Sequence, residues 1–150
     1  GTGGRNRRLL LGASWRAELV QAGFDPGRPA VVVSTGVSMY LTREANVETL
    51  REPAELAPGS TFAMTFLLPL ERADDDARPG LEQSARGARA SGTPFISFFE
   101  PGDVVELARA AGFRAVRHVS ADDLAARYFA GRSDGLRPPK NGEEILVATT

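Results

Sequence analysis

Cysteine is absent from this chain of 150 residues, and histidine is nearly so. Without cysteine there is no disulfide, no thiolate metal site and no cysteine nucleophile. The single histidine, His118, has no second histidine with which to share a metal, so we expect a strand histidine that faces solvent or is hydrogen-bonded locally. A GxSxG nucleophile motif is also missing. The absences exclude thiol chemistry and argue against the common hydrolases.

A surplus of one charge is missing as well. Lysine and arginine number 18 and aspartate and glutamate 19, so the formal net charge is −1. Nothing here attracts nucleic acid or an anionic membrane surface, and we expect neither as a partner. No apolar run approaches the roughly 20 residues that span a bilayer, and the LLL patch near the start is too short for a signal peptide. We therefore expect a globular cytoplasmic protein.

Two charged or glycine-rich stretches suggest sites but lack the context that such sites need. Consecutive carboxylates such as Asp74, Asp75 and Asp76 seldom point at one ion, and a block of like charges usually stays in water. The opening GTGGRN has no following GK[ST], no third glycine and no strand before it, so it is no phosphate loop. We interpret residues 1–14 as an atypical or disordered segment and residues 15–150 as the domain.

Capping residues, prolines and glycines delimit the expected helices. Ser14 precedes a helix that Gly23 should end, and Thr42 precedes one that should end or kink near Glu52 because Pro53 follows. The further helices expected are a weak one over 79–90, a clear one from Pro101 to Gly112, and one opened by the capping box SADD, Ser120 to Asp123.

Four apolar runs predict strands between these helices, over 30–34, 61–68, 113–119 and 144–150. The first, Ala30 to Ser34, is a β-branched run without polar alternation, which is typical of a central parallel strand covered on both faces. Alternating strands and helices predict an α/β fold with a mostly parallel sheet, and the last two strands could pair antiparallel at its edge.

The first strand stops on small polar residues, Ser34, Thr35 and Gly36. In open α/β sheets ligands bind beyond the carboxyl ends of the strands, and small residues there let a cofactor approach the backbone. Small residues are also ordinary turn formers. The pattern alone leaves both interpretations open.

Four blocks of the sequence, in this order, are VVVSTGVSMYLT, LAPGSTFAMTFLLPLE, GTPFISFF and DLAARYFAGRSDGLRPP. Together they resemble the leucine carboxyl methyltransferase family, and within it the large actinobacterial branch assigned as S-adenosyl-L-methionine-dependent methyltransferases. The resemblance runs from about Trp15 to Thr150. It implies the C-terminal half of a class I (Rossmann-like) methyltransferase, with a mostly parallel sheet and an antiparallel last strand. The cofactor it implies is S-adenosyl-L-methionine.

The resemblance also implies a site. Ser34, Thr35 and Gly36 would lie beside the methionine portion of the cofactor, although many relatives have glutamate at the position of Thr35. Tyr40 would lie near the transferred methyl group. Arg127, Tyr128 and Arg132 resemble residues near the acceptor, a small molecule or peptide that offers a carboxylate or hydroxyl; Tyr128 could equally be a packing residue.

The same resemblance implies parts that the chain does not contain. A relative of this kind carries the first three strands, the glycine loop and the ribose-binding acid before Trp15, so we expect a truncated chain whose strand at 30–34 is an exposed edge open to self-association. We expect such a chain to bind S-adenosyl-L-methionine weakly or not at all. The alternative to an enzyme is a non-catalytic remnant that folds partly or by association.

Overall fold

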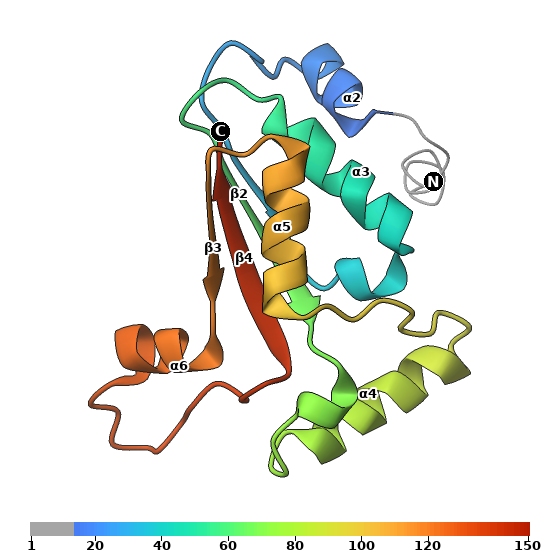
Figure 1. The fold of residues 1–150 in the computed structure, drawn as a ribbon, viewed down its shortest axis with the longest axis vertical. Helices are drawn as coiled ribbons and strands as arrows, with labels where there is room; N and C mark the ends of the chain where they lie inside the picture. The colour runs from blue at the N-terminus through green and yellow to red at the C-terminus, as the bar shows by residue number, and fades with distance from the viewer. Residues whose placement is uncertain (1–13) are drawn as a thin grey trace.

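The computed structural model describes residues 14–150, which form an α/β fold around one four-stranded sheet (Figure 1). The sheet has the order β1-β2-β4-β3, in which β1 and β2 are parallel and β4 is antiparallel to both of its neighbours. The expected fold class and the antiparallel last strand are confirmed, and the last two strands pair with β3 outermost. The strands are β1 Val31–Ser34, β2 Thr61–Leu67, β3 Ala115–Val119 and β4 Glu143–Thr149.

The helices follow their capping residues. Ser14 caps the first helix by accepting from the Ala17 N–H at 3.3 Å, and Thr42 caps the second by accepting from the Ala45 N–H at 3.2 Å. No helix of the described residues is long and apolar enough to cross a membrane. The α-helices are α2 Trp15–Gln21, α3 Arg43–Ala54, α4 Arg78–Ala90, α5 Pro101–Ala111 and α6 Ala121–Leu124; α6 continues into a π turn, Ala125–Phe129, and short 3₁₀ turns cover Ser38–Tyr40 and Leu70–Arg72.

Two helix ends show how local chemistry sets the boundaries. The helix end predicted near Glu52 is two residues too early: α3 continues through the buried Pro53 and ends at Ala54. In the last turn a proline costs only one backbone hydrogen bond, and its ring is buried here. Gly112 ends α5 as expected, with the left-handed φ of 111° that favours glycine.

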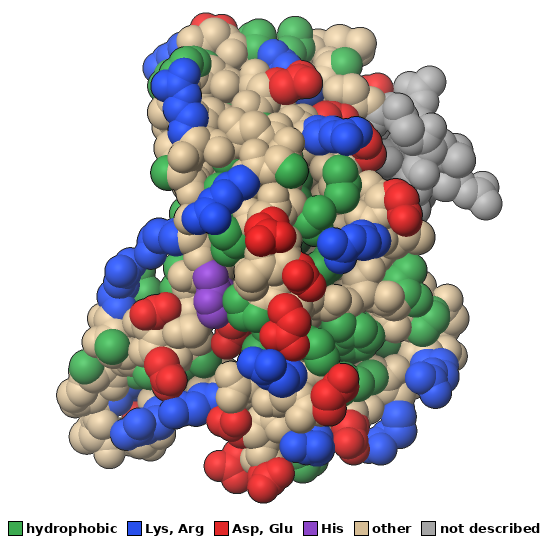
Figure 2. Space-filling view, viewed as in Figure 1, with side chains coloured by type: hydrophobic (Ala, Val, Ile, Leu, Met, Phe, Trp, Pro, Cys, Tyr) green, Lys and Arg blue, Asp and Glu red, His purple; other side chains and the backbone are tan. Residues whose placement is uncertain are grey.

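In the described residues the hydrophobic core cluster lies on one face of the sheet. Side chains of β2 and β4 that point to this face meet side chains of α3 and α5, and Figure 1 shows both helices in front of the sheet. The surface over them mixes acidic and basic side chains (Figure 2). The core includes Phe62, Met64 and Phe66 of β2, Leu146 and Ala148 of β4, Leu50 of α3, and Val104 and Ala108 of α5.

The opposite face and the β1 edge correct one prediction. The apolar run at 30–34 indicates a central strand covered on both faces, yet β1 is an edge strand that pairs only with β2 among the described residues. Val31 and Val33 point away from the core and are 75% and 61% exposed. The apolar sequence correctly predicts a strand at 30–34. It does not show which other strands or helices lie beside that strand. The edge expected from the resemblance is what the structure shows.

Candidate functional site

The loop after β1 is fixed against the end of β2. Gly36 has a φ of 66°, and its N–H donates to the Thr65 hydroxyl at 2.8 Å. A Cβ built on Gly36 would meet nothing within 4 Å. Thr35 and Gly36 are exposed and Ser34 is half-buried. The loop therefore offers open backbone at the carboxyl ends of two parallel strands, where ligands of α/β sheets bind.

A buried polar cluster holds the next segment, which carries Tyr40. The Ser38 hydroxyl donates to the Thr65 carbonyl at 2.8 Å. Asn46 of α3 is 1% exposed, and its amide nitrogen lies at 3.0 Å from the Ser38 carbonyl, 3.3 Å from that of Leu41 and 3.1 Å from that of Thr42. The 3₁₀ turn is therefore tied to both β2 and α3.

Tyr40 lies at the outer side of this turn. It is 43% exposed, and its ring meets Phe95 edge-on with 5.3 Å between centroids. The Ile96 N–H donates to the Met39 carbonyl at 2.8 Å, which pins the segment after α4 to the turn. Sequence reasoning missed both residues. Asn46 bonds to carbonyls four to eight residues before it, but an asparagine inside a helix gives no signal of burial, and Phe95 contacts Tyr40 from a distant part of the chain.

The predicted acceptor residues form a second, exposed group at the end of α6. Arg127 lies over the Tyr128 ring, 6.0 Å from its centroid, and Tyr128 is 65% exposed. Arg132 pairs with Asp134, and this hydrogen-bonded pair lowers the pKa of the Asp134 carboxyl and raises the pKa of Arg132. A carboxylate acceptor could bind Arg132 only in competition with Asp134.

The two groups are separated by the width of the sheet. The first follows β1 and the second follows β3, and two strands lie between them. With about 4.8 Å between neighbouring strands, the separation is on the order of 14 Å. Among the described residues no hydrogen bond, ion pair or ring contact joins the two groups. The structure thus brings Ser34, Thr35, Gly36 and Tyr40 to one end of the strands but does not bring Arg127, Tyr128 and Arg132 against them.

A cavity of about 1020 Å³ borders both groups. None of the seven predicted residues lines it, but their hydrogen-bond partners do: Thr65 accepts from Gly36, and Asp134 pairs with Arg132. Ile145 contributes to the floor, and α4 with the segment 134–140 forms the walls. The cavity therefore touches one hydrogen-bond partner of each group, Thr65 and Asp134, and not the predicted residues themselves.

Acidic side chains outnumber basic ones around this cavity. Asp74, Asp76, Asp134 and Glu143 line it together with Arg137 and Lys140. Asp74 accepts from the Asn141 amide at 2.7 Å, and Lys140 pairs with Asp122 at 3.0 Å. The described residues contain no cluster of three or more groups that could hold a metal ion. Sequence reasoning assigned Asp74 and Asp76 to a solvated loop and so missed that they line a cavity.

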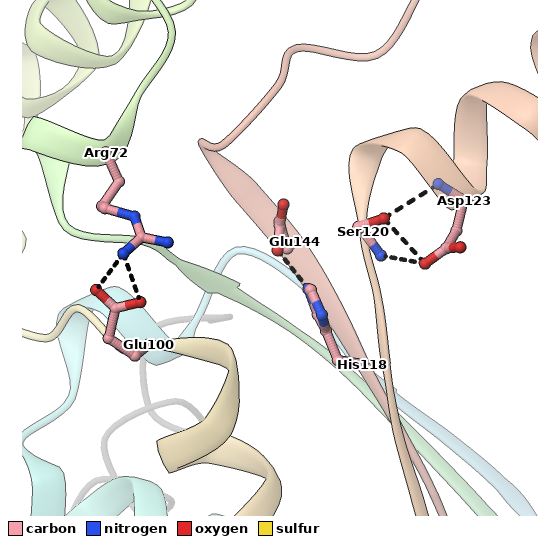
Figure 3. Close-up of polar contacts among 6 residues, drawn as sticks. All are labelled: Arg72, Glu100, His118, Ser120, Asp123 and Glu144. Atoms are coloured by element: carbon pink, nitrogen blue, oxygen red, sulfur yellow. Dashed lines mark hydrogen bonds and ion pairs between the residues drawn. The ribbon is translucent and has the colours of Figure 1, made fainter.

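His118 has an unexpected partner. Its Nε2 hydrogen-bonds to Glu144, a carboxylate on β4 that is 3% exposed, as Figure 3 shows. The Phe66 ring lies against the imidazole with 5.9 Å between centroids. His118 is hydrogen-bonded, as one of the two expected alternatives had it, but the bond is not local: the partner lies 26 residues away and is brought close by the pairing of β3 with β4. Figure 3 also shows Arg72 bridging to Glu100, which precedes α5.

The sheet order, with an antiparallel last strand between two parallel ones, is that of one half of a Rossmann-like α/β fold. Two solved structures share it: a DUF574 family protein from Streptomyces avermitilis (18% identical, TM-score 0.58, covering 89% of this chain and 51% of that one) and a "putative methyltransferase" from Thermobifida fusca (20% identical, TM-score 0.58, covering 97% and 51%). The chain spans about half the length of each.

Comparisons of the sequence show which part of the chain resembles a known family. The model of the leucine carboxyl methyltransferase family matches residues 10–54, a stretch that includes β1, the Ser34–Gly36 loop and Tyr40. A "Putative S-adenosyl-L-methionine-dependent methyltransferase" from Mycolicibacterium smegmatis is 40% identical over 63 residues, which cover 41% of this chain and 21% of the relative. The resemblance is confirmed over this part of the chain.

Proposed function

We propose that this chain belongs to a methyltransferase that uses S-adenosyl-L-methionine, and that the Ser34–Gly36 loop forms one wall of the cofactor crevice. The observation that carries the proposal is the coincidence of the family match at residues 10–54 with an open glycine loop at the ends of two parallel strands. When bound, the cofactor would supply an activated methyl group on a sulfonium sulfur.

The residues of this loop fit the methionine portion of such a cofactor. Two hydroxyl groups, open backbone and no side chain at Gly36 permit close contact with a polar, compact group. The Gly36 N–H is already engaged by Thr65, so the loop keeps its shape without a ligand. These residues make one wall only, and we expect a dissociation constant of roughly 1 mM or weaker for the chain alone.

We infer that the acceptor is a carboxylate or hydroxyl that enters through the cavity. A carboxylate is already a nucleophile, so the protein must chiefly align it, and alignment can contribute about 7–11 kcal/mol in favourable cases. Tyr40 stands next to the loop on a turn that Asn46 and Thr65 hold in place. Arg132 lies on the order of 14 Å away, so it can bind only a second anionic group of a larger acceptor, and only when it leaves Asp134. Thr35 brings no carboxylate to this arrangement.

Amide NMR spectra of the chain titrated with S-adenosyl-L-methionine test the proposal. We expect shifts at Ser34, Thr35, Gly36 and Thr65, whereas the capping box of α6 at 120–123 should not move. NAD at the same concentration is the control for non-specific nucleotide binding. Shifts that appear with both compounds, or that spare the loop at about 10 mM ligand, would contradict the proposal.

A second candidate is a non-catalytic chain that is stabilised by association. The exposed valines of β1 favour it, because a soluble edge strand is normally protected by charge or by a partner. Radiolabelled methyl transfer to a mixture of small carboxylic acids, alcohols and peptides separates the candidates, since only the enzyme labels an acceptor. Release of the label as methanol in base identifies a methyl ester, and a base-stable label identifies a methyl ether.

A further inference from the structure

An asparagine and a glycine stand together where the chain enters β4. Asn141 and Gly142 form the only Asn-Gly pair in the sequence. Among residues 14–150, Asn141 is the one residue other than glycine with a left-handed backbone, at a φ of 52°. Asparagine adopts this conformation more readily than most side chains do. The backbone at this step is therefore bent away from the ordinary strand and helix conformations.

Gly142 is fixed by its packing against α4. A Cβ built on Gly142 would lie 3.0 Å from Leu81 Cδ1, so any larger residue must displace the Leu81 side chain. The Gly142 carbonyl accepts from the Leu68 N–H at 2.9 Å, which extends the β2–β4 ladder by one step. The reverse bond is not made, and among the described residues the Gly142 N–H donates to no group. No hydrogen bond therefore restrains the nitrogen that follows Asn141.

The Asn141 side chain connects the start of β4 to the turn before α4. Its amide nitrogen donates to the Asp74 carboxylate at 2.7 Å, across 67 residues of sequence. Asp74 organises that turn, because its carbonyl accepts from the Ala77 N–H at 3.0 Å and from the Arg78 N–H at 2.9 Å. Asp74 also lines the cavity described above. One side-chain amide thus joins two segments that border the cavity.

We propose that Asn141 is a deamidation site, at which a spontaneous reaction with Gly142 converts the amide into a carboxylate and releases Asp74. The Gly142 nitrogen gives up its proton to water and attacks Asn141 Cγ, so that a C–N bond forms and the Cγ–Nδ2 bond breaks. Nδ2 takes up a proton from water and leaves as ammonia. The product is a cyclic imide, and no side chain on Gly142 hinders its formation.

Water then opens the imide at either of its carbonyl carbons. Attack at Asn141 Cγ breaks the new bond and gives aspartate, whereas attack at the Asn141 backbone carbonyl carbon breaks the original peptide bond and gives isoaspartate. In both cases the Gly142 nitrogen regains its proton, so the net change is one water consumed and one ammonia released. The reacting groups belong to neighbouring residues, so the reaction does not depend on what lies over the sheet, nor on methyl transfer.

The products place a like charge beside Asp74. A carboxylate at position 141 has no donor for the Asp74 carboxylate, and two carboxylates repel each other. It also adds to the acidic side chains at the border of the cavity. Because the contact between Asn141 and Asp74 is exposed, we expect the turn before α4 to loosen while the fold is kept.

Peptide mapping by mass spectrometry, after incubation in water that carries heavy oxygen, measures the reaction. We expect the label at position 141, faster at mildly alkaline than at neutral pH because the attacking nitrogen must lose its proton. Asn46, which lies within α3 and precedes a valine, should stay unlabelled.

Gly142→Ala should slow the labelling on the order of tenfold, because the added methyl group hinders the attack. Gly142→Ala/Leu81→Ala, which makes room for that methyl group, should be equally slow, and circular dichroism confirms that each variant is folded. An Asn141 that stays unlabelled after weeks at alkaline pH, or equal rates in the wild type and in both variants, overturns the proposal.

Amide hydrogen exchange at Ala77 and Arg78 measures the release of Asp74. Asn141→Asp reproduces one product, whereas Asn141→Gly removes the amide without adding charge and suits the left-handed φ. We expect exchange to rise by about two- to fivefold in Asn141→Gly and further in Asn141→Asp, and salt should reduce only the second increase. Equal exchange in all three chains would mean that the Asn141 amide does not hold the turn, and would overturn the release of Asp74.

Discussion

Single residues on this chain carry polar contacts that determine how the strand ends are held. Asn46 and Glu144 are both almost fully buried; Asn46 bonds to carbonyls of the preceding turn, and Glu144 bonds to His118 on the neighbouring strand. A polar group that is buried without a hydrogen-bond partner loses its hydration and gains nothing in return. The hydrogen bonds of these two residues therefore constrain the structure more than surface ion pairs do.

Replacing His118 by alanine should destabilise the fold by about 1–3 kcal/mol, because the buried Glu144 carboxylate loses its hydrogen-bond partner. The loss should lie at the lower end of this range, since the His118 side chain is partly exposed. Urea unfolding measures the change in the free energy of unfolding. His118→Ala/Glu144→Leu, which removes both polar groups, should be more stable than the single variant; an equal or larger loss would show that Glu144 does not depend on His118.

Asn46→Asp keeps the shape of the side chain but removes the N–H donors that the carbonyls of Ser38, Leu41 and Thr42 accept. We expect a loss of about 2–3 kcal/mol and faster amide exchange at Tyr40. Asn141→Asp is the matched exposed control, and its single contact with Asp74 should contribute less than about 1 kcal/mol. Equal losses in the two variants would mean that burial of Asn46 is unimportant.

At the scale of the element, α6 illustrates how a short helix depends on its cap. Ser120 accepts from the Asp123 N–H at 3.1 Å, and the Asp123 carboxylate accepts from the Ser120 N–H at 2.9 Å (Figure 3). The Ser120 backbone N–H, and next its hydroxyl, lower the pKa of Asp123. The ionised carboxylate is therefore the form that the folded helix prefers.

This preference predicts a pH dependence. Because the folded pKa of Asp123 lies below its unfolded value, the stabilisation is complete above the unfolded pKa of about 4 and is lost as pH falls through the folded pKa. The wild type should exceed Asp123→Asn in stability at pH 7, and the difference should shrink below about pH 4. The pKa of Asp134 is also lowered, but Asp134 is present in both proteins and cancels. A difference that stays constant down to pH 2 would contradict this account.

Helix termini and strands follow from local chemistry, which is why the sequence predicts them well. Ser14, Thr42, Gly112 and Ser120 each act within one helical turn, and their roles are visible in short windows. The neighbours of β1, the partner of His118 and the lining of the cavity depend on which strands meet. No window of sequence contains that information, so the exposure of Val31 and the pairing with Glu144 appear only in the structure.

At the scale of the whole molecule, the sheet has one covered face and one that no core cluster covers in the described residues. Stability must then come chiefly from the side packed by α3 and α5. Phe66 is fully buried on that side. Replacing it with alanine should lower the free energy of unfolding by about 3–5 kcal/mol, which is comparable with the total stability of a small domain.

Val147→Ala is the matched change on the other face, since Val147 is a half-buried neighbour on β4. We expect it to cost about 1 kcal/mol or less, because a half-exposed side chain has less area to lose. Guanidinium unfolding of both variants decides the point. Similar losses would show that the second face is packed as well as the first.

The place of β4 in the sheet has a consequence for the order of folding. Among the described residues β3 joins the rest of the sheet only through β4, although β4 follows β3 in the chain. Until β4 is inserted, β2 and β3 have no strand between them, and Phe62, Met64 and Phe66 lack Leu146 and Ala148 as packing partners. Because the register joins Thr61 to Thr149, closing this sheet requires contacts between distant parts of the sequence, and such contacts slow folding.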